Sequence, residues 1–192
     1  VERVIRFAFE YALNNKKADG SPRGKVLMCD KSNVMTYAGS LWLRAFKQVA
    51  SEFPQIKAEH MYVDALCMQI VRDPQAFDVI VTNNMFGDIV TDLAAALQGG
   101  LGMAASGNIH PGRTSMFEPV HGSAPPLAGK NVANPMGAIL TAAMMLAHLG
   151  LTSEAQKIEA VVFEAVRQKK ITQDLGGSLG TKEVGEWIVT KL

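Results

Sequence analysis

Apolar and polar positions follow two different periods along the chain, and the changes between them outline its secondary structure. Apolar side chains three and four residues apart over residues 1–15 predict an amphipathic helix. Short, mainly apolar runs bounded by turn-forming residues predict buried strands. By these criteria we expect strands at residues 25–29, 57–63, 77–81 and 115–117, and further helices at 39–53, 135–149, 152–169 and 181–192. This alternation predicts an α/β fold with mainly parallel sheets flanked by helices.

A change in composition near residues 98–102 divides the chain. The sequence GGLGMAASGNIHPGRTS, which begins at residue 99, is rich in small and turn-forming residues and contains few large apolar ones. We therefore predict parts of two domains, residues 1–98 and 99–192. Because the chain starts at Val1 and enters a helix at once, we expect it to be the later part of a longer two-domain protein.

The overall composition excludes several classes of protein. A net charge of +1, with 19% charged and 48% hydrophobic residues, is typical of a globular protein and lacks the basic excess of nucleic-acid binders. No signal peptide or apolar run of membrane-spanning length is present. Cys29 and Cys67 lie in apolar segments without C-x-x-C spacing, which predicts reduced thiols in a cytoplasmic protein.

A pair of carboxylates follows the predicted strand at 77–81. Within TNNMFGDIVTD, residues 82–92, the helical spacing places Asp88 and Asp92 one turn apart on the same face. Carboxylates held this close repel each other unless a cation lies between them, and Mg²⁺ or Mn²⁺ prefers oxygen ligands. The alternative is a solvated helix with two unrelated acids. The position after a strand favours the metal site, because open α/β sheets bind ligands there.

Three predicted strands end in polar residues. Asp30 and Lys31 follow the first, Asp64 ends the second, and Asn83 and Asn84 follow the third. If the strands are parallel, these ends converge at one edge of the sheet, although each alone could be an ordinary surface residue. A nearby metal ion disfavours the charged form of a lysine, so Lys31 is a candidate general base.

A second candidate site is the glycine- and proline-rich loop of residues 118–135, EPVHGSAPPLAGKNVANP. Backbone N–H groups around Gly122 and Gly129, with Lys130 nearby, could surround a phosphate-bearing ligand. Pro135 would begin a helix whose positive end faces the loop. The alternative is an ordinary surface loop.

Residues 100–105 match the pattern G-x-G-x-x-A of dinucleotide-binding proteins. That pattern requires a strand before it and a helix after it. Here a helix is expected before it and a turn after it, so we reject this segment as a nucleotide site.

Together these stretches resemble the β-decarboxylating dehydrogenases, which include the isocitrate and isopropylmalate dehydrogenases. The resemblance covers nearly the whole chain. It is carried by DKSNV (30–34), YVDA (62–65), NNMFGDIVTDLAA (83–95), FEPVHGSAP (117–125), ANP (133–135) and DLGGSLGT (174–181). It implies an isopropylmalate-dehydrogenase-like, two-domain fold of which this is the later part. Residues 1–98 would belong to the catalytic and dimerisation domain, and residues 99–192 to the cofactor-binding domain.

The resemblance also implies an activity and a shared active site. These enzymes oxidise the hydroxyl of a 2-hydroxy diacid, pass hydride to NAD or NADP and release CO₂, with Mg²⁺ or Mn²⁺ bound to the substrate. Asp88 and Asp92 would bind the metal from one subunit. Asp64, also a metal ligand, and Lys31, the catalytic base, would come from the other subunit of a homodimer.

The family resemblance assigns cofactor binding to the second loop. The matching residues are Glu118, His121, Gly122, Ser123, Ala124 and Asn134. NAD-dependent members usually carry an aspartate directly after HG[ST]AP, and NADP-dependent isocitrate enzymes carry Lys-Tyr. This chain has Pro126 and Leu127 there, without a cation for a 2′-phosphate, so we expect NAD rather than NADP.

Two features bear on the substrate. DLGGSLGT and Val34 are similar to the isopropylmalate type, which predicts 3-isopropylmalate as substrate and a role in leucine biosynthesis. ASGNIHPG also suits isocitrate- and tartrate-type relatives, and the family's substrate-binding arginines and catalytic tyrosine lie upstream of these residues. A non-catalytic regulatory subunit is disfavoured because the lysine and all three aspartates are present, and a truncated dimerisation module remains an alternative.

Overall fold

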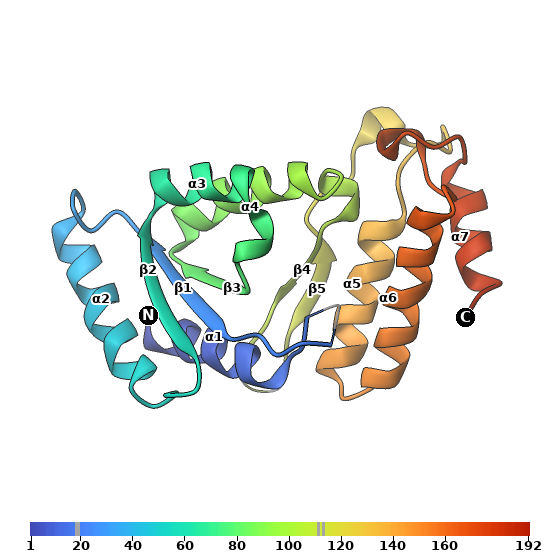
Figure 1. The fold of residues 1–192 in the computed structure, drawn as a ribbon. Coiled ribbons are helices and arrows are strands. Elements are labelled where there is room, and N and C mark those ends of the chain that lie inside the picture. Colours follow the sequence, from blue (N-terminus) through green and yellow to red (C-terminus); the bar gives the residue numbers. More distant parts are fainter. Residues whose placement is uncertain (18–19, 111, 113) are drawn as a thin grey trace. The chain divides into compact units, whose positions relative to one another are not determined.

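The computed structural model describes residues 1–17, 20–110, 112 and 114–192 (Figure 1). Contacts within the chain group it into two compact units, Val1–Ala94 and Ala95–Leu192. The composition change near residues 98–102 lies a few residues after this division. The catalytic and cofactor-binding roles assigned to the two parts stay predictions.

The first unit is a three-stranded parallel sheet with helices on both faces (Figure 1). Its strands lie in the order β2-β1-β3, and β1 pairs in parallel with both neighbours. The elements are α1 (Glu2–Asn14), β1 (Lys25–Asp30), α2 (Thr36–Ala50), β2 (Lys57–Tyr62), α3 (Val63–Arg72), the 3₁₀ turn η1 (Pro74–Ala76), β3 (Val79–Thr82) and α4 (Asn84–Leu97). The predicted α/β fold class is confirmed.

The central strand β1 is buried on both faces, and its side chains alternate between two cores. Val26 and Met28 pack against α1 and α2, whereas Leu27 and Cys29 pack against α3 and α4. Burial raises the pKa of the Cys29 thiol to about 11. Both Cys29 and Cys67 are free thiols, as expected. A continuous apolar strand in the middle of a parallel sheet thus organises this unit.

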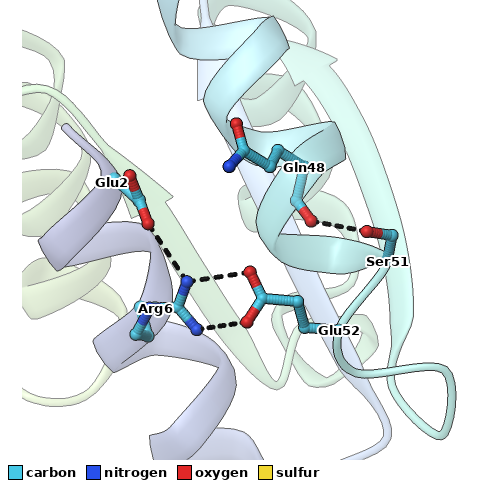
Figure 2. A network of polar contacts seen from close by, with 5 residues as sticks. All are labelled: Glu2, Arg6, Gln48, Ser51 and Glu52. Carbon is cyan, nitrogen blue, oxygen red and sulfur yellow. Dashed lines mark hydrogen bonds and ion pairs between the residues drawn. The ribbon is translucent and has the colours of Figure 1, made fainter.

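A charged contact holds the end of α2 against α1 (Figure 2). Arg6 donates two hydrogen bonds to Glu52, at 2.6 and 2.8 Å, and a third to Glu2 at 3.1 Å. The hydrogen bonds from Arg6 to Glu52 lower the pKa of the Glu52 carboxyl. Ser51 closes the last turn of α2 by donating to the carbonyl oxygen of Gln48, 2.7 Å away. Because Arg6 binds both carboxylate oxygens of Glu52, the pair fixes the orientation of the two side chains as well as the distance between them.

A buried carboxylate fixes the entry to β1. The Asp78 side chain, only 3% exposed, lies 2.6 Å from Lys17 Nζ and accepts hydrogen bonds from the backbone N–H groups of Gly24 and Lys25. Burial alone would raise the pKa of Asp78. The hydrogen bonds from Lys17 and the two N–H groups outweigh it, so the pKa lies below its ordinary value of 3.8.

We expect Asp78→Asn to destabilise the fold by about 2 kcal/mol at neutral pH, because hydrogen bonds to a charged acceptor are lost. A carboxyl whose pKa is lowered on folding stabilises the protein above its unfolded-state pKa of 3.8, and this stabilisation disappears as the pH falls through the lower folded-state value. The difference between variant and wild type should therefore shrink below pH 4. Urea unfolding at pH 7, 5 and 3.5 measures it.

The matched control is Glu10→Gln, which removes an exposed carboxylate from α1. We expect it to change the free energy of unfolding by less than about 0.5 kcal/mol. A destabilisation by Asp78→Asn that is the same at all three pH values would contradict the ionic role of Asp78.

The second unit combines a small antiparallel strand pair with packed helices (Figure 1). Helix α5 packs against α6 and against both strands, and α6 packs against α7. Met136, Val162 and Val184 are fully or almost fully buried in its core. The elements are η2 (Leu101–Met103), β4 (Ala105–Asn108), β5 (Met116–Pro119), η3 (Pro125–Leu127), α5 (Met136–His148), α6 (Thr152–Arg167), η4 (Gln173–Leu175) and α7 (Thr181–Val189).

Several sequence expectations for this unit need correction. Strand β4 was expected to be an irregular turn, but it pairs antiparallel with β5. Helix α5 begins at Met136, with Pro135 as its cap rather than its first residue. The segment at 100–105 follows helix α4 and leads into β4, which supports rejecting it as a dinucleotide pattern. Across the described ranges, no helix combines the length and apolar character that crossing a membrane requires.

Candidate active site

Lys31 and Asp64 form an ion pair at the carboxyl ends of two adjacent parallel strands. The Nζ atom of Lys31 lies 2.7 Å from Oδ1 of Asp64. Lys31 directly follows β1, and the register pairs Asp30 with Tyr62, so the chain leaves both strands at the same edge. Asp64 lies in the first turn of α3 rather than at a strand end as expected. The parallel register thus brings together two residues that are 33 positions apart.

The Nζ atom of Lys31 contacts two groups, the Asp64 carboxylate and the Tyr62 ring. It lies 5.7 Å from the centre of the Tyr62 ring, within the range of a cation–π contact. The hydrogen bond from Lys31 and the backbone N–H groups at residues 64 and 65 lower the pKa of the Asp64 carboxyl. The Lys31 side chain is 25% exposed and that of Asp64 68% exposed. Lys31, the candidate base, is therefore largely shielded from solvent, whereas Asp64 is exposed to it.

A buried carboxylate shapes the turn that carries Lys31. Asp30, the last residue of β1, is 4% exposed. Its Oδ1 atom accepts a hydrogen bond from the Ser32 backbone N–H at 3.1 Å and lies 2.8 Å from His60 Nε2. The turn also packs tightly on α2, because a Cβ atom at Gly39 would overlap Ser32. A small pocket adjoins this turn and is lined by Asp30, Lys31, Met35, Ala38, Gly39, Trp42, Asn83 and Phe86.

The two carboxylates of the predicted metal site lie on the exposed face of α4. Asp88 and Asp92 are one helical turn apart, and Asn84 donates a hydrogen bond to Asp88 at 3.2 Å. Asn83 caps the start of this helix by accepting the Phe86 N–H at 3.0 Å. In the part of the chain that the structure describes, no three His, Cys, Asp or Glu side chains form a single cluster. The oxygen donors fit a hard divalent cation, which needs further ligands beside these two.

The predicted cofactor loop starts at β5, and most of its residues are exposed. Glu118 is exposed, and its carbonyl oxygen accepts a hydrogen bond from Ser106 at 2.7 Å. His121 Nδ1 lies 3.0 Å from the carbonyl oxygen of Gly122, and residues 122–133 are exposed throughout. Ala124 has a φ of +42°, a left-handed conformation that is uncommon for alanine. This strained turn presents Gly122 and Ser123 to solvent.

Asn134 differs from the rest of the loop because its side chain is engaged inside the unit. Its Nδ2 donates to Asp174 at 3.1 Å, and its Oδ1 accepts the N–H of Met136 at 2.9 Å. Thr172 donates a hydrogen bond to the other oxygen of Asp174. A Cβ atom at Gly102 would lie only 2.9 Å from Cβ of Asn134. Three separate sequence segments therefore meet at the start of α5.

A family model described as isocitrate/isopropylmalate dehydrogenase matches residues 1–188. The chain belongs to this family. It is 47% identical over 194 residues to the 3-isopropylmalate dehydrogenase of Corynebacterium jeikeium and 49% identical over 191 residues to that of Archaeoglobus fulgidus. These alignments cover all of this chain but 54% and 56% of the relatives, so the chain spans about half their length.

A solved structure from the isocitrate/isopropylmalate dehydrogenase family has the same fold as this chain. The chain superposes on the crystal structure of isocitrate dehydrogenase from Methylococcus capsulatus with a TM-score of 0.90 at 43% identity. The match covers 99% of this chain and 55% of that one. The family resemblance expected from the sequence is thereby confirmed.

Within this family member, sequence reasoning missed two residues of the site region. His60 contacts Asp30, and its only sequence signal was its place two residues before Tyr62, on the same face of a strand. Asp174 lay within the DLGGSLGT segment, yet no role was assigned to it. The structure brings Lys31 and Asp64 together, and their catalytic and metal-binding roles stay predictions.

Proposed function

We propose that the protein containing this chain is an NAD-dependent 3-isopropylmalate dehydrogenase of leucine biosynthesis, acting in the cytoplasm as a homodimer. The reaction is the metal-dependent oxidative decarboxylation of a 2-hydroxy diacid. The observation that carries this proposal is the Lys31–Asp64 pair at the carboxyl ends of β1 and β2, in a chain 47–49% identical to relatives of that name.

Lys31 serves as the base in this proposal. The Nζ atom of Lys31 would take up the proton of the substrate hydroxyl, and NAD, when bound, would supply the hydride acceptor. The Oδ1 atom of Asp64, 2.7 Å from Nζ, orients the amine in this proposal. The Tyr62 ring restricts the lysine from one side. The ion pair and the ring together orient the base.

Asp88 and Asp92 of one subunit, with Asp64 of the partner subunit, hold Mg²⁺ or Mn²⁺ in this proposal. The exposure of all three carboxylates supports ligand sharing across a subunit interface. When bound, the metal supplies positive charge that stabilises the oxygen on which negative charge develops in the substrate. Sharing also satisfies the requirement of these cations for more oxygen ligands than two carboxylates offer.

Large apolar side chains on α3 and α4 support the homodimer. Met68 and Val71 of α3, and Met85 and Ile89 of α4, are each more than half exposed. Large apolar side chains that are exposed on the helices of one unit favour burial against another protein surface. In this proposal a second copy of the same surface covers these side chains, and the dimer brings the Lys31–Asp64 pair of one subunit to Asp88 and Asp92 of the other.

The loop at residues 118–134, which is exposed throughout residues 122–133, supports binding of the dinucleotide. In this proposal the backbone around Gly122, Ser123 and Ala124, with Glu118, His121 and Asn134, contacts NAD. Pro126 begins a stretch without a cation at the position where a 2′-phosphate would need one, which favours NAD over NADP. Because the Asn134 side chain is bound to Asp174, it contributes through its backbone or through the shape of the loop.

The test is a spectrophotometric assay of the full-length protein with 3-isopropylmalate, isocitrate and tartrate. Each is paired with NAD or NADP, and with Mn²⁺ or a chelator. We expect reduction of NAD only with 3-isopropylmalate, lost on chelation and restored by Mn²⁺. Preference for isocitrate, the substrate named for the Methylococcus relative, would overturn the substrate and pathway. An absence of turnover with all three would favour a non-catalytic subunit.

A further inference from the structure

His60 lies in β2, two residues before the end of the strand. Among the described residues, no hydrogen bond, ion pair or ring contact joins it directly to Lys31 or Asp64. His60 is paired in register with Met28, and its side chain reaches diagonally across to Asp30 on β1. Two residues further on, Tyr62 points from the same face of β2. The side chain is 29% exposed, so His60 is neither a core residue nor a free surface residue.

His60 is connected to Lys31 by two routes. On the first, His60 Nε2 lies 2.8 Å from Oδ1 of Asp30, the oxygen that also accepts the Ser32 N–H and so closes the turn around Lys31. On the second, the His60 ring meets the Tyr62 ring edge-on, with ring centres 5.2 Å apart. Lys31 Nζ lies over that same ring, 5.7 Å from its centre.

The first route matters energetically because the Asp30 side chain is almost fully buried. A buried carboxylate requires hydrogen-bond donors. Its Oδ1 has Ser32 and His60, whereas its Oδ2 is buried and has no hydrogen-bond partner among the residues that the structure describes. Removing the His60 donor would leave one hydrogen bond for the whole group. Rotation of the carboxylate toward another donor would then weaken its hydrogen bond with Ser32 and alter the conformation of the turn that positions Lys31.

We propose that His60 is a positioning residue for Lys31, acting through the Asp30 turn and the Tyr62 ring. This inference rests on the proposed role of Lys31 as the base. His60 touches no substrate or reacting atom in this proposal. Its effect is on how often Lys31 Nζ occupies the reactive position, so it concerns kcat rather than the binding of substrate or cofactor.

The test compares three substitutions of His60 in the full-length protein, assayed with 3-isopropylmalate, NAD and Mn²⁺. H60A removes both routes, H60F keeps a ring beside Tyr62 but lacks the N–H donor, and H60Q keeps an amide donor near the position of Nε2. We expect H60A and H60F to lower kcat about tenfold or more while both KM values change less than about twofold, since small displacements of a reacting group are costly. H60Q should recover most of kcat.

The matched control is Glu59→Gln, on the same strand but the opposite face, where Glu59 pairs with Lys57. We expect its kcat to be that of wild type. Values for H60A and H60F within twofold of this control would overturn the proposal. A loss that only follows the folded fraction measured by circular dichroism, or an H60Q no better than H60F, would also overturn it.

A second readout does not depend on turnover. After reductive ¹³C-methylation, the Lys31 signal is assigned by its absence in K31R. It should shift in H60A and H60F but keep the wild-type position in H60Q. If wild type turns over no substrate, the proposed function fails while this shift still tests positioning. An unshifted Lys31 signal in H60A and H60F would overturn the positioning role alone.

Discussion

Lys31→Ala should lower kcat of the full-length protein by about a thousandfold, while the protein remains folded. The expected loss is that of a general base, whose removal typically costs about 10²–10⁴ in rate. The Lys31 ammonium group lies on the Tyr62 ring and an exposed carboxylate, so its removal leaves the apolar core unchanged. Initial rates of NADH formation at saturating substrate, with circular dichroism of the same sample, measure both quantities.

The control for this experiment is Lys57→Ala. Lys57 also forms an ion pair with a carboxylate, that of Glu59. It is the first residue of β2, at the end of the sheet away from Lys31, and its side chain is largely exposed. We expect its kcat to match wild type. If Lys31→Ala retained more than a tenth of the wild-type rate, the assignment of the base would be wrong, even if the protein proved to be an isopropylmalate dehydrogenase.

Gly177→Ala should destabilise the second unit by about 3 kcal/mol. A Cβ atom at this position would overlap the backbone carbonyl of Ile171, and a backbone atom cannot move aside as the end of a flexible side chain can. The same turn is closed by hydrogen bonds from Gly177 N–H to Thr172 and from Leu179 N–H to Ile171. The midpoint of urea unfolding, followed by circular dichroism, gives the change.

Gly185→Ala provides the opposite result in the same unit. Gly185 lies within α7, and a Cβ atom there would meet nothing within 4 Å. Since alanine favours helix more than glycine does, we expect a gain of about 0.5–1 kcal/mol. Equal effects of the two substitutions would show that the conformation around Gly177 differs from the one described.

The elements with strong periodic signals were predictable, whereas β4 was not. Apolar runs and helical stripes located four strands and most helices of the chain close to their observed bounds. The sequence of β4, Ala105–Asn108, contains neither a β-branched nor an aromatic residue. It is a strand because β5 pairs with it, and the missing side chain of Gly107 lets the Phe117 ring lie across it. That cause is tertiary and leaves no local pattern.

The same distinction applies to the site. The meeting of Lys31 and Asp64 follows from one rule, that the carboxyl ends of parallel strands share an edge. The contact of His60 with Asp30 depends instead on the register between β1 and β2. A shift of one residue would turn His60 to the other face of the sheet. Periodicity alone does not determine register, so this histidine had no visible role in the sequence.

The buried thiol of Cys29 makes the central strand directly observable by chemical modification. Only a thiolate reacts rapidly with alkylating reagents, and burial holds the pKa of Cys29 near 11 as well as blocking access to it. Cys67, which is only partly buried on α3, provides the comparison thiol. Alkylation of Cys29 therefore requires β1 to separate from its neighbours. Its rate measures how often the strand that carries Lys31 opens under native conditions.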